Sequence, residues 1–105
     1  MNEHCLVLVT CPDRAIAVTI ASALVKEKLA ACVNVVEGVT SIYRWKDEVR
    51  QDDEVLLIIK SRTDCFMAIE RRVRALHPYD VPEIISWDFP AGSAPYLDWI
   101  DESTR

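Results

Sequence analysis

Glycine and histidine are scarce in this chain of 105 residues, and each scarcity excludes a class of chemistry. The two glycines, Gly38 and Gly92, lie far apart, whereas a phosphate-binding loop needs several glycines close together so that its backbone can approach the phosphates. The two histidines are His4 and His77, and neither belongs to a readable set of nucleophile, adjacent base and orienting group. The sequence therefore predicts a protein that is not an enzyme.

Long hydrophobic runs and an excess of positive charge are also missing. The longest apolar segments span residues 5–9 and 55–59, far short of the roughly 20 residues that cross a membrane. The start of the chain lacks the basic residues of a secretory signal. A net charge of −5 disfavours nucleic acid and anionic membranes, because both attract a positive field. We expect a cytoplasmic protein with no membrane and no nucleic-acid partner.

The four cysteines form no C-x-x-C pair, which disfavours both a zinc ribbon and a thioredoxin-type redox site. In a reducing compartment a buried cysteine usually behaves as a small hydrophobic residue, and this is the default interpretation of Cys5 and Cys65. Cys11 lies before a turn and Cys32 lies where a helix meets a strand. Cys11 and Cys32 are therefore the two cysteines that are candidates for a functional role.

Half of the residues are hydrophobic, which predicts one folded domain over residues 1–105. Asp13 suits the N-cap of a first helix, and Thr63 or Asp64 suits that of a second. Apolar periodicity predicts strands at 5–11, 31–45, 49–60 and 83–89, helices at 14–28 and about 64–77, and a short final helix that starts at Ser93. This β-α-β-β-α-β order predicts an α+β ferredoxin-like fold, a four-stranded antiparallel sheet with both main helices on one face.

The segment 31–60 predicts two unusually long strands joined by a tight turn at 46–48. Gly38 interrupts the first strand and predicts a bulge or bend. The turn lacks the glycine that such turns usually contain. We expect a ribbon of this length to project beyond the main sheet. A neighbouring subunit is the simplest structure that could cover its exposed surface.

Six segments, taken in order, resemble the CutA family of divalent-cation tolerance proteins. They are residues 9–13 (VTCPD), 27–34 (EKLAACVN), 41–45 (SIYRW), 58–61 (IIKS), 77–83 (HPYDVPE) and 96–100 (YLDWI). The resemblance implies a ferredoxin-like subunit in a compact homotrimer whose long strands pair between subunits, a plan that resembles the PII signalling proteins. It also implies a role in tolerance to copper and other divalent cations.

The resemblance further implies copper ligands: a cysteine on the first strand, a cysteine after the first helix and histidines at the end of the second. Cys32 and His77 fall on two of these positions, whereas Val9 stands at the first-strand position with Cys11 two residues later, and Leu76 replaces one histidine. Copper, above all Cu(I), prefers thiolate and imidazole ligands. Cys32, His77 and Cys11 are therefore the candidate copper ligands. The alternative is structural: buried thiols at corners and an imidazole at a helix C-terminus.

A second hypothesis makes the protein a PII-like trimeric module for ligand sensing or scaffolding, in which metal binding is incidental. Tyr43, Trp45, Lys60 and Glu83 would then line a pocket between subunits for a small anion or a partner loop. Alternatively, the aromatic side chains pack across strands and Lys60 extends to water. Glu83 would in that case pair with an arginine, for which the candidates are Arg44, Arg62 and Arg74.

Overall fold

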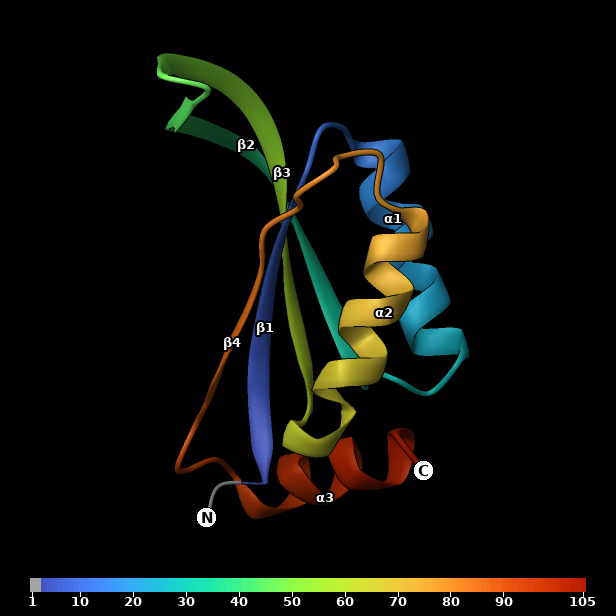
Figure 1. Cartoon of the computed structure of the whole chain (residues 1–105). Helices are drawn as coiled ribbons and strands as arrows, with labels where there is room; N and C mark the ends of the chain where they lie inside the picture. Colours follow the sequence, from blue (N-terminus) through green and yellow to red (C-terminus); the bar gives the residue numbers. More distant parts are fainter. Residues whose placement is uncertain (1–2) are drawn as a thin grey trace.

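Four strands and three helices make up the computed structural model, which describes residues 3–105 (Figure 1). Residues 1 and 2, which the predicted domain includes, lie outside the described part. The elements are β1 (His4–Cys11), α1 (Arg14–Lys26), β2 (Cys32–Trp45), β3 (Glu48–Arg62), α2 (Phe66–Leu76), β4 (Ile84–Asp88) and α3 (Ala94–Ser103). The strands pair in the order β2-β3-β1-β4, and every pair is antiparallel. The predicted α+β fold with a four-stranded antiparallel sheet is confirmed.

The first helix begins as predicted and ends earlier. Asp13 Oδ1 accepts a hydrogen bond of 2.9 Å from the N–H of Ile16, which makes Asp13 the N-cap. Lys28 adopts a left-handed conformation with φ 61°, and the next two N–H groups turn back to the carbonyl of Leu24 at 2.9 and 3.2 Å. This reversal stops α1 at Lys26 and directs the chain into β2.

The second helix begins later than predicted. Residues Thr63–Cys65 form a 3-10 turn, and no side chain caps α2. The Thr63 hydroxyl instead donates to Asp88 Oδ1 at 3.0 Å, and Asp64 accepts from Arg62 Nη1 at 3.0 Å. Both predicted caps are thus engaged in contacts with neighbouring segments rather than with the helix.

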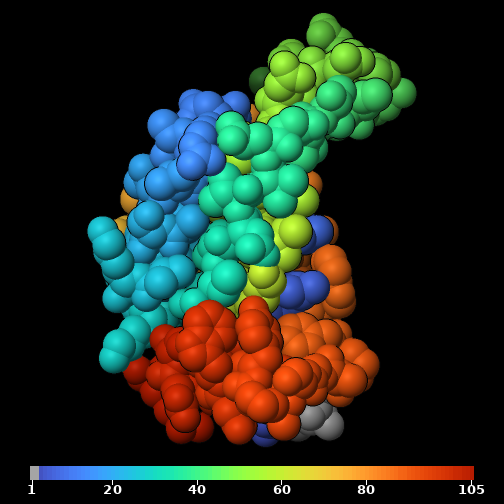
Figure 2. Space-filling model, turned by 180° about the vertical axis from the view of Figure 1, so that it is seen from behind, coloured from blue at the N-terminus to red at the C-terminus, as the bar shows by residue number. Residues whose placement is uncertain are grey.

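The strands β2 and β3 continue past the sheet as a two-stranded arm, residues 39–54 (Figures 1 and 2). Gly38, with φ 83°, lies at a shift in the β2–β3 register, which confirms the predicted bulge. Lys46 and Asp47 have φ of 51° and 66°, the left-handed values that a two-residue hairpin turn requires. Every residue from 42 to 53 is exposed, so the rest of the chain leaves the end of the arm uncovered.

The two faces of the sheet differ in their cover. Residues that pair across strands share a face, and Val7, Val9, Leu57 and Ile59 are fully buried beneath α1 and α2. The opposite side, here called the open face, carries no such layer (Figure 1). It consists of apolar residues from three strands: Leu6 and Leu8 of β1, Leu56 and Ile58 of β3, and Ile85 and Trp87 of β4.

The open face includes two large apolar side chains of β4 that are about half exposed. Ile85 is 51% exposed and Trp87 is 48% exposed. Figure 2 shows α3 across the lower end of the molecule, with strand residues uncovered above it. Ile85 pairs with Leu8 and Trp87 pairs with Leu6, so these apolar side chains lie next to one another on the open face. None of the helices in the described part of the chain is long and apolar enough to span a membrane.

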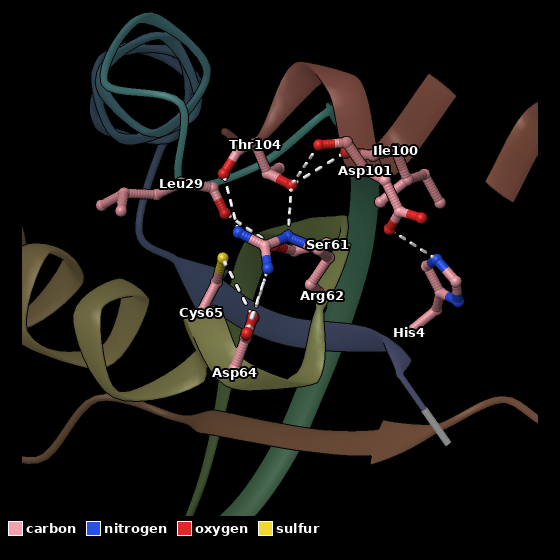
Figure 3. A network of polar contacts seen from close by, with 9 residues as sticks. All are labelled: His4, Leu29, Ser61, Arg62, Asp64, Cys65, Ile100, Asp101 and Thr104. Atoms are coloured by element: carbon pink, nitrogen blue, oxygen red, sulfur yellow. Dashed lines mark hydrogen bonds and ion pairs between the residues drawn. The ribbon is translucent and has the colours of Figure 1, made fainter. Parts of the chain in front are cut away.

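The last helix is held by a polar network around Arg62 (Figure 3). Arg62 Nε donates to Thr104 Oγ1 at 2.8 Å, and Nη2 donates to the carbonyl of Thr104 at 2.9 Å. His4 Nε2 lies 2.9 Å from Asp101 Oδ1, which ties the start of β1 to the same helix. Thr104 is only 5% exposed, so its carbonyl depends on this guanidinium for a partner.

We predict that Arg62→Ala lowers the free energy of unfolding by about 2 kcal/mol, because it removes charge-assisted hydrogen bonds and leaves a buried carbonyl without its donor. Arg71→Ala removes an exposed arginine of α2 and should change the stability by less than about 0.5 kcal/mol. Urea denaturation at one protein concentration measures both values. Equal losses for the two variants would contradict this account of how α3 is held.

Candidate functional site

Cys32 lies at the beginning of β2, opposite Lys60 of β3. Its side chain is half-buried and points to the open face, whereas the other three cysteines are buried. Lys60 Nζ lies 3.9 Å from Cys32 Sγ and also donates to the side-chain oxygen of Asn34. Cys32 is therefore the cysteine whose sulfur is nearest to solvent.

Cys11 lies at the other end of the sheet, where β1 ends opposite Val55. It is fully buried on the face that α1 and α2 cover. Burial, together with the negative charges of Glu54 and Asp13, raises the pKa of the Cys11 thiol to about 11. Cys11 is consequently a protonated thiol at neutral pH, and a metal would have to displace its proton in an apolar setting.

The register separates the two candidate thiols. Cys32 pairs with Lys60 and Cys11 pairs with Val55, five positions away on β3. At about 3.3 Å of rise per residue this is roughly 16 Å along the sheet. The two thiols also occupy opposite faces, so they cannot share one metal ion within a chain.

His77 follows α2 and is 7% exposed, with both ring nitrogens engaged. Nε2 lies 2.7 Å from the carbonyl oxygen of Thr10, and the backbone N–H of Tyr79 donates to Nδ1 at 3.2 Å. A carbonyl only accepts and an amide N–H only donates, so in this geometry Nε2 is the donor and Nδ1 is the acceptor. The imidazole has no free lone pair for a metal in this arrangement.

The donor set therefore does not fit copper within a single chain. Among residues 3–105, no three His, Cys, Asp or Glu side chains are grouped so that they could hold a metal ion. The structure brings His77 near the end of β1 that contains Cys11, and it leaves Cys32 at the far end of the sheet. The three predicted ligands are not assembled by one subunit.

Three of the four predicted pocket residues do come together. Tyr43, Trp45 and Glu83 line a hollow of about 560 Å³ at the base of the arm, here called the arm pocket. Lys60 does not reach it, because Lys60 lies beside Cys32 near the opposite end of β3. Sequence reasoning missed Thr10, Arg50, Glu54, Tyr79 and Asp80, which also line the hollow.

Two of the missed residues, Glu54 and Tyr79, carry no local signal of their contact. Glu54 is the last acidic residue before the buried part of β3, and Tyr79 follows directly after His77-Pro78. The segment after α2 runs back across the strands at the base of the arm, and this carries Tyr79 to Glu54 (Figure 1). Only the path of that segment in space reveals the contact.

The arm pocket is acidic and partly desolvated. The Tyr79 hydroxyl donates to Glu54 Oε2 at 3.1 Å, and burial together with the Glu54 charge raises the pKa of Tyr79 to about 12. Glu83 remains exposed, yet partial burial of its carboxyl and the nearby Glu54 charge raise its pKa. None of the arginines suggested as partners of Glu83 forms an ion pair with it in the described part of the chain.

Known proteins match this chain over nearly its whole length. The sequence model of the CutA1 divalent ion tolerance protein family matches residues 5–103. The chain is 54% identical over 99 residues to the divalent-cation tolerance protein CutA of Thermus thermophilus, which covers 94% of this chain and 96% of that protein. It is 49% identical over 94 residues to the CutA homolog of Xenopus laevis, which covers 90% of this chain but 62% of that longer protein.

Solved structures agree with the sequence matches. The divalent cation tolerance protein Cut A1 from Thermus thermophilus superposes with a TM-score of 0.95 at 52% identity, over 97% of this chain and 99% of that one. CutA1 from Oryza sativa gives a TM-score of 0.96 at 42% identity, over 99% and 95% of the two chains. A protein described as the periplasmic CutA of Archaeoglobus fulgidus gives 0.95 at 33% identity, over 97% and 99%. The resemblance found in the sequence is thus confirmed, and the chain belongs to the CutA1 family of divalent ion tolerance proteins.

Proposed function

We propose that this protein acts in divalent-cation tolerance as a homotrimer that binds copper ions and catalyses no reaction. The open face is the observation that supports the proposed trimer. Leu6, Leu8, Leu56 and Ile58 form a partly exposed apolar surface on the side of the sheet opposite α1 and α2, and Trp87 adds a half-exposed indole. Burying this surface between subunits is favourable by about 25 cal/mol per Å². The exposed arm supplies a further surface for a neighbouring subunit.

Copper is proposed as an ion that the assembly binds, with Cys32 as its contact. Cys32 is the half-buried thiol, and it lies on the same face that assembly would cover. Since residues 3–105 of one chain group no three metal-ligating side chains, the proposal completes the coordination with atoms from more than one subunit. The cytoplasmic location is part of the same proposal, because four free cysteines are typical of a reducing compartment.

A second candidate function is favoured by the arm pocket. In it the protein is a PII-like trimeric module for ligand sensing or scaffolding, and metal binding is incidental. A hollow of about 560 Å³ with polar and aromatic walls has the size of ordinary small-molecule sites. Under this candidate, ligand binding should survive treatment of the protein with a chelator.

For the assembly, we predict that Trp87→Glu converts the trimer to monomer. A carboxylate buried without a partner costs several kcal/mol at each interface. Met67→Glu is the matched control, because Met67 is 71% exposed on α2, away from the open face. Sedimentation equilibrium should give three times the chain mass of 11.9 kDa for the wild type and the control, and one chain mass for Trp87→Glu. A monomeric wild type would refute the assembly.

For copper, we predict that Cys32→Ser abolishes high-affinity Cu(I) binding in calorimetric titrations under reducing conditions. Cys65→Ser, at a buried cysteine, should bind like the wild type. His77→Ala should keep the copper stoichiometry and lower the thermal stability, since it removes the donor to the Thr10 carbonyl. Wild-type affinity in Cys32→Ser would contradict the assigned contact. Loss of copper by folded His77→Ala would assign the imidazole to the metal.

A further inference from the structure

We propose that the outer side of α2 is a docking surface for an acidic segment of a partner protein, a stretch of polypeptide in which carboxylates flank an apolar side chain. The surface, here called the basic surface, consists of Met67, Glu70, Arg71 and Arg74. The inference goes beyond the proposed function, since it depends on neither copper nor the arm pocket.

The charges of this protein are unevenly distributed along the chain. Segments 14–28 and 66–76, which contain α1 and α2, hold six of the twelve basic residues and only two of the seventeen acidic residues. The helices are therefore positively charged in a chain whose net charge is −5. Such a separation of charge creates a local positive potential, which attracts an acidic partner.

The basic surface lies on the side of α2 that faces away from the sheet. Its four residues are three, one and three positions apart, so they share one side of the helix, and they border a shallow hollow of about 290 Å³. Met67 is 71% exposed, and both arginines are exposed. Ile69 and Val73, on the opposite side of the helix, are fully buried in the core. The arginines are thus presented to solvent by a helix that is itself well anchored.

Arg71 and Arg74 have no carboxylate partner among residues 3–105. Arg72, which lies between them in the sequence, is directed to α1, and its Nε lies 3.0 Å from both carboxylate oxygens of Glu27. Glu70 borders the same hollow but forms no ion pair with either exposed arginine in that part of the chain. Two guanidinium groups are therefore available to bind carboxylates of another molecule.

The side chains of the basic surface indicate the chemistry of the partner. A guanidinium group binds a carboxylate through two parallel N–H donors. Met67 adds a flexible, polarizable apolar side chain that adapts to aliphatic and aromatic groups. An acidic segment with an apolar side chain among its carboxylates makes both kinds of contact.

Two features disfavour a partner rich in phosphate. Arg71 and Arg74 lie beyond the first turn of α2, where the backbone N–H groups bond within the helix and cannot surround a phosphate. Two available cations neutralise few phosphates, and a net charge of −5 repels a nucleic acid. An acidic polypeptide is thus the anion that this surface fits best.

The proposed trimer leaves the basic surface uncovered. The helices α1 and α2 lie on one side of the sheet, and the open face lies on the other (Figure 1). Burying the open face between subunits therefore does not bury the outer side of α2. A trimer would present three copies of the surface, which favours a partner with repeated acidic segments.

The test is fluorescence-anisotropy titration of a labelled peptide of six glutamates and two leucines with the whole protein at low ionic strength. The matched control peptide has glutamine at every glutamate position. We expect saturable binding of the acidic peptide that weakens as salt is added, and no saturable binding of the glutamine peptide.

Substitutions locate the binding on α2. Arg71→Gln and Arg74→Gln should each weaken peptide binding about threefold, the size expected for one exposed charged pair, and the double variant about tenfold. Met67→Ser should weaken it severalfold by removing the apolar contact. Arg105→Gln removes an equal charge from an exposed position after α3 and should bind like the wild type. Circular dichroism checks that each variant is folded.

Three outcomes would overturn the inference. One is the absence of acidic-peptide binding to the folded wild type. Another is equal weakening by Arg71→Gln and Arg105→Gln, which would mean that the peptide responds only to the overall charge. The third is displacement of the bound peptide by a single-stranded oligothymidylate at equal ionic strength, which would assign the surface to nucleic acid.

Discussion

One physical constraint governs this protein: α1 and α2 cover one face of an apolar sheet, whereas on the opposite face α3 covers only the end near His4 and Arg62. The buried side chains of β1 and β3, such as Val7 and Leu57, face α1 and α2 and form the core. Leu8 and Ile58 on the other face have no equivalent cover from their own chain. An antiparallel sheet can leave one face to water, but that face is then normally polar. The proposed assembly therefore rests on the apolar open face.

Much of the fold was predictable because it depends on local patterns. The strand β1, the N-cap at Asp13 and the bulge at Gly38 each follow from a few neighbouring residues, and all three are present. The predicted caps of α2 were wrong. The Thr63 hydroxyl donates to Asp88 of β4, a contact with a distant segment that no local pattern reveals, and Asp64 pairs with Arg62 two residues before it. The left-handed turn at Lys46 likewise forms without the glycine that usually signals it.

The candidate site was less predictable because it depends on which segments meet in space. The family resemblance placed Cys32, His77 and Cys11 in one set, while the strand register puts the thiols on opposite faces and far apart. The sequence predicted a pocket between subunits, whereas Tyr43, Trp45 and Glu83 line a hollow within one chain. Its acidic character was not foreseen, since Glu54 and Asp80 are distant in sequence and Lys60 was expected in the wall.

His77 connects these observations. From the sequence alone, His77 could be either a metal ligand or a structural residue. In the structure, both of its ring nitrogens contact backbone groups, of Thr10 and of Tyr79. Its effect is to join the end of β1 to the segment after α2, at the base of the arm. A substitution there would remove the contacts to both Thr10 and Tyr79 and so disturb the pocket and the fold together.

The central claim is that other copies of the chain cover the open face, and hydroxyl-radical footprinting of the wild type tests it most directly. Trp87 is 48% exposed in the single chain and Met67 is 71% exposed on the helical side. The account predicts that Trp87 is protected from oxidation at concentrations where the trimer forms, while Met67 is oxidised readily. Oxidation of Trp87 at the rate of a freely exposed indole, under those same conditions, would contradict it.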